Sequence, residues 1–120
     1  NAKLYLCVEG VGLLAKSSVF INSGNAGTGY IVPVWANTVC DYLLENNILY
    51  RYNGTGSNWS WNRIGIAEFA RNNTVIEAAI PLVSLQLSLG RTIRLGYILS
   101  DSGSLRIPGP GQALPAYILS

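Results

Sequence analysis

Residues 38–53 read TVCDYLLENNILYRYN, two apolar stretches separated by the polar turn Glu45-Asn46-Asn47. Short runs rich in aromatic and branched side chains, bounded by turn residues, are typical of β-strands. Asparagine tolerates the backbone angles that a tight turn requires. The stretch therefore predicts a β-hairpin, and a hairpin of this kind favours an antiparallel all-β fold.

Period-two alternation continues on both sides of this hairpin. In KLYLCVE, residues 3–9, three aliphatic side chains point one way and Tyr5 and Cys7 the other. Further strands are expected at SSVFIN (17–22), YIVPVW (30–35), WSWNRI (59–64), TVIEAAI (74–80), TIRLGYILS (92–100) and the tail segment 116–119. About seven to nine short strands with frequent turns predict an antiparallel, jelly-roll-like β-sandwich.

One segment departs from this alternation. PLVSLQL, residues 81–87, places Pro81 at a position suited to the first turn of a helix, with Leu82, Leu85 and Leu89 on one side. We therefore expect one short helix near residues 81–87. The length of 120 residues fits a single domain, residues 1–120.

The charge content is low. Charged residues make up 12% of the chain, against roughly 25% in a typical soluble domain. The net charge of +2 gives no reason to expect nucleic acid, and no apolar run is long enough to span a membrane. We infer that glycans or neighbouring molecules cover part of the surface.

Several features favour an extracellular or cell-surface location. The chain begins at Asn1 and contains no methionine, so we expect a processed form or a piece of a longer protein. Three glycosylation sequons occur, at Asn53, Asn58 and Asn72. Cys7 and Cys40 lie in strand-like runs, and either a disulfide between two strands or two buried free thiols fits their context.

Catalysis has little support. The chain has no histidine, which removes the common nucleophile–base and histidine–metal sites. Its six acidic residues are scattered, and no segment offers the facing carboxylate pair of a glycosidase. We expect a protein that is not an enzyme and that binds no cofactor.

The glycine-rich segment GNAGTG, residues 24–29, allows three interpretations. No helix is expected after it, so a phosphate-binding loop is disfavoured. A calcium loop needs several carboxylate or carbonyl ligands, and the nearest acid is Asp41, so calcium is weakly supported. A turn with positive φ at Gly24, Gly27 or Gly29 explains the segment best.

Five segments in order carry a family resemblance: VFINSGNAGTGY (19–30), CDYLLE (40–45), LYRYNGTGSNWSW (49–61), VIEAAIPLVSL (75–85) and IRLGYILSDSG (93–103). Over residues 3–119 the chain resembles DOMON-like domains and family 9 carbohydrate-binding modules. The resemblance implies a β-sandwich of secreted or cell-surface proteins. Such domains have one or two strands ahead of the segment that matches residues 3–9, and we expect these strands to be missing here. The acidic, often calcium-associated positions of that pattern correspond here to Asn22, Ser23 and Asn25, and Asp41 alone matches.

Two functions follow as hypotheses. The first is a non-catalytic structural subunit of an extracellular filament, pilus-like fibre or surface layer, forming a homo-oligomer or polymer by β-strand complementation. A missing opening strand would leave an unpaired edge. The candidate donor or edge residues are Leu4, Leu6, Val8, Tyr117 and Leu119.

The alternative is a carbohydrate-binding module, which the resemblance implies most directly. Sugars stack on exposed aromatic rings within a ring of polar groups. The candidate stacking residues are Trp35, Trp59, Trp61, Tyr50 and Tyr52. Trp59 and Trp61 alternate onto one face of their expected strand, and we expect both to be core residues.

Overall fold

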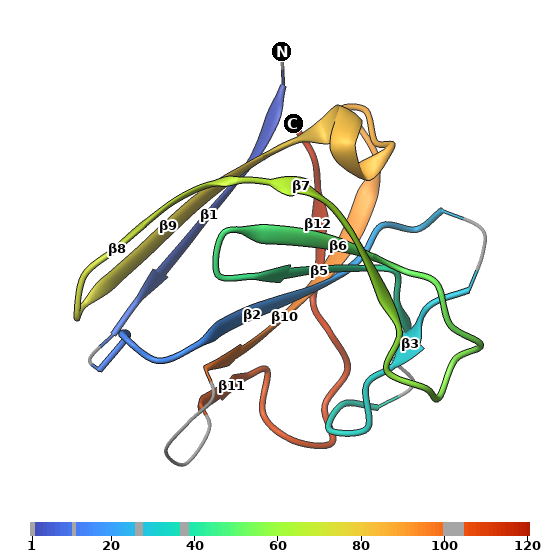
Figure 1. Ribbon diagram of the computed structural model, residues 1–120, viewed down its shortest axis with the longest axis horizontal. Helices are drawn as coiled ribbons and strands as arrows, with labels where there is room; N and C mark the ends of the chain where they lie inside the picture. The colour runs from blue at the N-terminus through green and yellow to red at the C-terminus, as the bar shows by residue number, and fades with distance from the viewer. Residues whose placement is uncertain (1, 11, 26–27, 37–38, 100–104) are drawn as a thin grey trace.

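The chain forms an antiparallel β-sandwich in which a three-stranded sheet packs against a larger sheet (Figure 1). The computed structural model describes residues 2–10, 12–25, 28–36, 39–99 and 105–120. Within them the strands are β1 (Lys3–Glu9), β2 (Ser17–Asn22), β3 (Tyr30–Ile31), β4 (Val39–Cys40), β5 (Tyr42–Glu45), β6 (Ile48–Tyr52), β7 (Trp61–Ile66), β8 (Glu68–Arg71), β9 (Val75–Pro81), β10 (Thr92–Leu99), β11 (Leu105–Ile107) and β12 (Ala116–Ile118). The all-β class and the antiparallel sandwich are thus confirmed.

The strand order shows which strands are central. The small sheet runs β1-β9-β8, and the large sheet runs β11-β10-β2-β5-β6-β7, with β12 also pairing with β10. A separate ribbon joins β3 and β4. The predicted hairpin is β5 and β6, paired from Glu45 opposite Ile48 onward. Asn46 in its turn has φ 50°, a positive value that asparagine accepts.

Two apolar cores lie on the two faces of the large sheet. Between the sheets, residues of β1 and β9 meet alternate residues of β2, β5 and β10, including Leu4, Ile80, Ile21, Leu44 and Ile93. On the opposite face, a second cluster contains Phe20, Leu43, Cys40, Val32, Trp35 and Leu114. Because β2 and β5 are covered on both faces, their sequences read as continuous apolar runs.

The loop layer over the second face accounts for one wrong expectation. Only Tyr30–Ile31 of the predicted strand 30–35 is extended. The chain then leaves the sheet near Pro33, and Trp35 packs edge-on against Phe20 at 5.8 Å between ring centroids. The indole Nε1 of Trp35 donates to the carbonyl of Pro108 at 2.7 Å, which fastens the loop to the tail segment.

The expected helix is a short 3₁₀ turn, Leu82–Leu85, preceded by Pro81. It ends at Gln86, whose φ of 55° is left-handed. Leu82 and Leu85 are buried, as their spacing predicted, whereas Leu89 is exposed. None of the helical structure in the described part of the chain has the length and apolar character that crossing a membrane requires.

The two sides of the sandwich differ. On one side β7 ends in the large sheet and β8 begins in the small sheet, with only Ala67 between them, so one continuous segment closes that side (Figure 1). Ala67 is buried, and its N–H donates to the carbonyl of Asn47 at 2.8 Å. On the other side β1 is an edge strand, and among the described residues only β9 pairs with it.

Candidate functional site

The first candidate site is an aromatic cluster at one end of the large sheet. Trp59 lies edge-on to Tyr30, with 5.0 Å between ring centroids, and 5.5 Å from Trp61. Trp61 in turn lies 5.1 Å from Tyr52. Such edge-to-face arrangements are the favoured geometry of aromatic pairs, so the cluster holds Trp59 in a defined position.

The five candidate stacking residues have different environments. Trp35 and Tyr52 are buried, with 3% and 5% of their surface exposed, so neither offers a face to a ligand. Tyr50 and Trp61 are half-buried. Trp59 is 57% exposed, and the expectation that it is a core residue is wrong. The cause is that β7 begins only at Trp61, which leaves Trp59 in the preceding loop.

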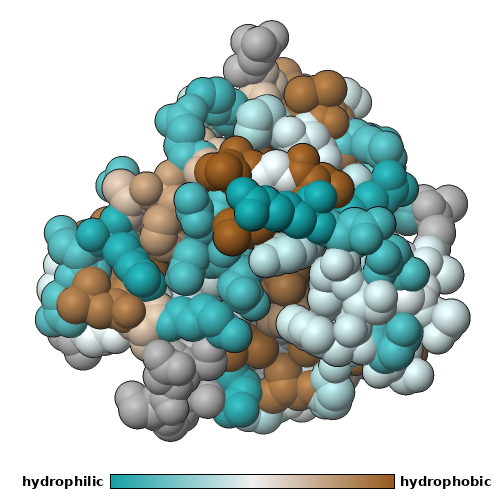
Figure 2. All heavy atoms as spheres, viewed as in Figure 1, coloured by the Kyte–Doolittle hydropathy of each residue, from teal (hydrophilic) through white to brown (hydrophobic). Residues whose placement is uncertain are grey.

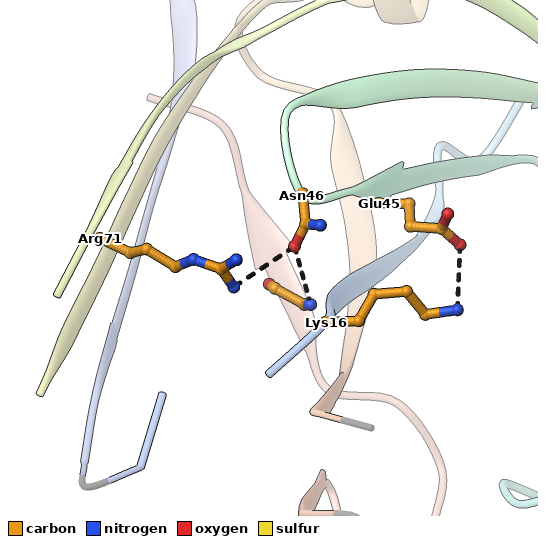
Figure 3. A network of polar contacts seen from close by, with 5 residues as sticks. Lys16, Glu45, Asn46 and Arg71 are labelled. Atoms are coloured by element: carbon orange, nitrogen blue, oxygen red, sulfur yellow. Dashed lines mark hydrogen bonds and ion pairs between the residues drawn. The ribbon is translucent and has the colours of Figure 1, made fainter. Parts of the chain in front are cut away.

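Two shallow hollows flank Trp59. One, of about 370 Å³, is lined in part by Tyr30, Val34 and Arg106, and the other, of about 250 Å³, by Tyr50 and Trp61. Glu45 lines both hollows and forms an ion pair with Lys16 at 3.6 Å (Figure 3). An exposed indole beside charged and polar groups is the arrangement by which proteins bind sugars.

Hydrogen bonds within the loop that precedes Trp59 define its shape. The hydroxyl of Tyr52 accepts the N–H of Gly56 at 2.8 Å and donates to the carbonyl of Asn58 at 2.7 Å. The side-chain oxygen of Asn58 accepts the N–H of Thr55 at 2.8 Å. Gly54 packs so closely on Tyr52 that a Cβ there would lie 2.4 Å from its hydroxyl. The loop therefore has little freedom to move Trp59.

All three sequon asparagines have exposed side chains, a condition for glycosylation. Asn53 donates to the side-chain oxygen of Asn62 at 2.8 Å. Asn72 closes the β8–β9 turn by accepting the N–H groups of Thr74 and Val75 at 2.8 and 2.9 Å. Their occupancy stays a prediction.

Gly24 has φ 78°, the positive value that a turn at this glycine requires, and its N–H donates to the side-chain oxygen of Asn22 at 2.9 Å. Gly27 lies outside the described residues. Asp41 accepts hydrogen bonds from both the N–H and the hydroxyl of Ser23, so its carboxylate already holds this turn. No group of three or more acidic or cysteine side chains that could hold a metal occurs in the described ranges.

The disulfide considered for Cys7 and Cys40 is absent, and both are free cysteines. Cys7 is exposed on the outer face of β1, whereas Cys40 is buried in the cluster behind the large sheet. Burial raises the pKa of the Cys40 thiol well above its ordinary value. Only one of the two cysteines therefore fits the alternative of buried free thiols.

The second candidate site is the open side of the sandwich. Between β1 and the edge formed by β10–β12 lies a groove of about 260 Å³. We call it the open-side groove; its lining includes Leu6, Val8, Leu95, Tyr97, Ile107 and Tyr117. Leu6, Val8 and Leu95 belong to the edge of the core between the sheets and are only half-buried.

The candidate donor segments both pair within their own chain. β1 pairs with β9 over seven residues, and β12 pairs with β10 over three. Leu119, next to β12, is buried and exchanges backbone hydrogen bonds with Gly90 and Arg91 at 2.7 and 2.9 Å. Neither terminal strand is therefore free to be donated in this structure, and β1 is instead an edge that can accept a strand.

Sequence comparisons add no assignment to these two sites, since no protein-family model, no curated protein and no solved structure matches the chain.

Proposed function

We propose that this protein is a non-catalytic structural subunit of an extracellular or cell-surface assembly, such as a filament, a pilus-like fibre or a surface layer, whose copies associate through strand edges. The observation that carries the proposal is the unprotected edge of β1 beside the apolar open-side groove. An unpaired edge of this kind is a template for pairing with another chain.

The other edge strands of the two packed sheets have features that prevent such pairing. β8 has only four residues. β7 pairs with β6 in a register that shifts between Leu49 and Tyr50, and β7 carries Arg63. β11 and β12 have three residues each and adjoin Pro108 and Pro115. β1 has seven residues and no proline, glycine or bulge, so the contrast supports β1 as the contact edge.

The surface composition supports contacts of the same kind. Only 14 side chains are charged, 8 basic and 6 acidic. On the face shown in Figure 2, hydrophobic patches are interspersed with hydrophilic ones. Exposed apolar residues include Leu14, Ile66, Val83, Tyr117 and Ile118. Contacts between copies would therefore depend on strand pairing and apolar packing more than on salt bridges.

Electron microscopy of the purified chain, with size-exclusion chromatography and light scattering on the same sample, tests this function. We expect regular filaments or sheets above a threshold concentration. A monomer up to millimolar concentration, with no ordered particles, would contradict the proposal. Amorphous aggregates that scatter light without a repeat would count against it too.

A carbohydrate-binding module is the second candidate, and the exposure of Trp59 between two hollows favours it. A glycan array followed by calorimetry tests it. Trp59→Ala should abolish binding, because most of the affinity for a sugar ring comes from stacking on the indole. Tyr5→Ala, at an aromatic residue on the other sheet that is more exposed than Trp59, is the control and should leave binding unchanged.

A further inference from the structure

The hydrogen-bonding groups on the outer edge of β1 are defined by its pairing with β9. The N–H of Leu82 donates to the carbonyl of Ala2 at 3.0 Å, and the N–H of Gly10 donates to that of Thr74 at 2.9 Å. These two pairs lie in the register of the β1–β9 ladder. Because hydrogen-bonded positions alternate in antiparallel ladders, the even-numbered residues of β1 bond to β9 and the odd-numbered ones point away.

Pro81 agrees with this assignment. It lies opposite Lys3, a position that needs no N–H from β9. The outward-pointing groups of β1 are therefore the N–H and C=O of Lys3, Tyr5, Cys7 and Glu9, and they form a regular seven-residue edge.

The sequence of β1 is complementary to itself when reversed. Its order is Lys-Leu-Tyr-Leu-Cys-Val-Glu, with opposite charges at the ends and Leu6 in the middle. In an antiparallel pair of two such strands centred on Leu6, Lys3 lies opposite Glu9 of the other copy and Tyr5 opposite its Cys7. Both pairs join odd-numbered residues, whose backbone groups already point outward.

We propose that β1 pairs antiparallel with β1 of a second copy about a two-fold axis at Leu6, which joins the two small sheets into one continuous six-stranded sheet. The proposal rests on the proposed function and names the contact. Up to eight backbone hydrogen bonds form, two in each of the four odd-numbered pairs. Charge complementarity between Lys3 and Glu9 at both ends selects this register over its neighbours.

The open-side groove accommodates the inner face of the incoming strand. Leu4, Leu6 and Val8 all lie on the face of β1 that packs toward the core. The same residues of the second copy would lie beside the half-buried Leu6 and Val8 and cover apolar surface that each monomer exposes. On the outer face the pair places the exposed Tyr5 beside Cys7 of the other copy.

This contact joins only two copies and cannot extend further, because both copies use the same strand. It therefore produces dimers, and a filament or layer needs a second contact elsewhere on the surface. The dimer is then the repeating unit of the assembly.

Proline at position 7 separates pairing between copies from folding. The N–H of Cys7 points to the outer edge, so Cys7→Pro leaves the bonds between β1 and β9 in place. Each dimer loses two hydrogen bonds, and we expect its dissociation constant to rise at least about thirtyfold. Cys7→Ser is the matched control and should dimerise like the wild type in sedimentation-velocity experiments.

Charge exchange gives a second test that does not depend on proline. Glu9→Lys and Lys3→Glu each place like charges opposite one another at both ends of the homodimer, which should weaken it about tenfold. An equimolar mixture of the two variants restores both opposite-charge pairs and should form heterodimers at wild-type concentrations. Glu68→Gln removes the partner that Lys3 has within its own chain and should leave dimerisation unchanged.

The outcomes distinguish the contact from the function. Unaltered dimers in Cys7→Pro, or a mixture that associates no better than its separate components, would overturn the β1 pairing. Ordered wild-type polymers that persist in Cys7→Pro would overturn the pairing and leave the assembly function standing. Dimers that Cys7→Pro abolishes, with no larger particle at any concentration, would support the pairing and contradict the assembly.

Discussion

The two sides of the sandwich differ in how the sheets are joined. On the closed side a single segment passes from β7 through Ala67 into β8 and joins both sheets covalently. On the open side β1 and the β10–β12 edge have no strand between them in the described residues, and a groove lies there instead. The comparison shows that a small sandwich can join its sheets covalently on one side and leave a strand edge exposed on the other.

Polar contacts reinforce the closed side. Arg71 of β8 donates to the carbonyl of Ala15 at 2.6 Å. Its guanidinium also lies 3.5 Å from the side-chain oxygen of Asn46, which accepts the N–H of Ser17 at 3.0 Å (Figure 3). The end of the small sheet is thus held to the β5–β6 turn and to the start of β2. Lys3 and Glu68 form an exposed ion pair across the small sheet at 2.5 Å.

The largest expected effect is a break of the closed side. Ala67→Asp places an unpaired carboxylate where only 6% of the residue is exposed. We expect the free energy of unfolding to fall by about 3–5 kcal/mol, measured by urea denaturation. Ile66→Asp, at the exposed neighbouring residue, is the control and should change it by about 1 kcal/mol or less. Equal losses in both variants would show that Ala67 does not join the sheets as described.

Thiol reactivity compares the exposed open side with the buried interior. Cys7 should react with a thiol reagent in the native protein, whereas Cys40 is inaccessible and burial raises its pKa. Since unfolded molecules are about one in a thousand or fewer, Cys40 should react at least about a thousandfold more slowly. If copies pair at β1, the rate at Cys7 should also fall as protein concentration rises. Two equally fast thiols would place Cys40 outside the core.

The turn at Asn46 offers an intermediate effect. Asn46→Ala removes the acceptor for the N–H of Ser17 and puts an alanine at φ 50°. The lost hydrogen bond and the strained backbone together should cost about 2 kcal/mol of unfolding free energy. Asn46→Gly relieves the strain and should recover roughly half of that loss. A glycine variant no more stable than the alanine variant would show that the backbone angle contributes little.

The smallest expected effect concerns Lys3. The hydrogen bond and charge of Glu68 raise the pKa of Lys3 above its ordinary value of 10.5. A raised folded-state pKa adds stability below the unfolded value, and that contribution disappears as the pH rises through the folded value. NMR titration should show a raised midpoint in the wild type and an ordinary one in Glu68→Gln. A titration of Lys3 that is the same in both proteins would rule out the ion pair in solution.

Period-two patterns predicted most of the fold. The β5–β6 hairpin, the faces of β1 and the alignment of Ile93, Leu95, Tyr97 and Leu99 on β10 follow from side-chain alternation alone. β8 was missed because EFAR is short, charged at both ends and contains one large apolar side chain. The β3 segment was predicted too long because burial under a loop layer resembles burial in a strand.

The candidate sites were less predictable. Trp59 and Trp61 share a face only if the strand includes both, but β7 begins at Trp61. Trp59 lies in the loop before it, where the hydroxyl of Tyr52 donates to the carbonyl of Asn58. Cys7 and Cys40 lie on different layers, which spacing along the chain does not reveal. The open-side groove arises from segments far apart in sequence, so no local motif marks it.

The pairing of β1 with β9 also bears on the order of folding. β5 and β6 are neighbours in sequence, whereas β1 must find β9, with Glu9 opposite Val75 and Lys3 opposite Pro81. Long loop closure costs entropy before its contacts form, so we expect β1 to dock last. Pulse-labelling hydrogen exchange should show late protection of its even-numbered amides. The contact surface that we propose on β1 is then completed only in the final folding step, when β9 holds β1 extended.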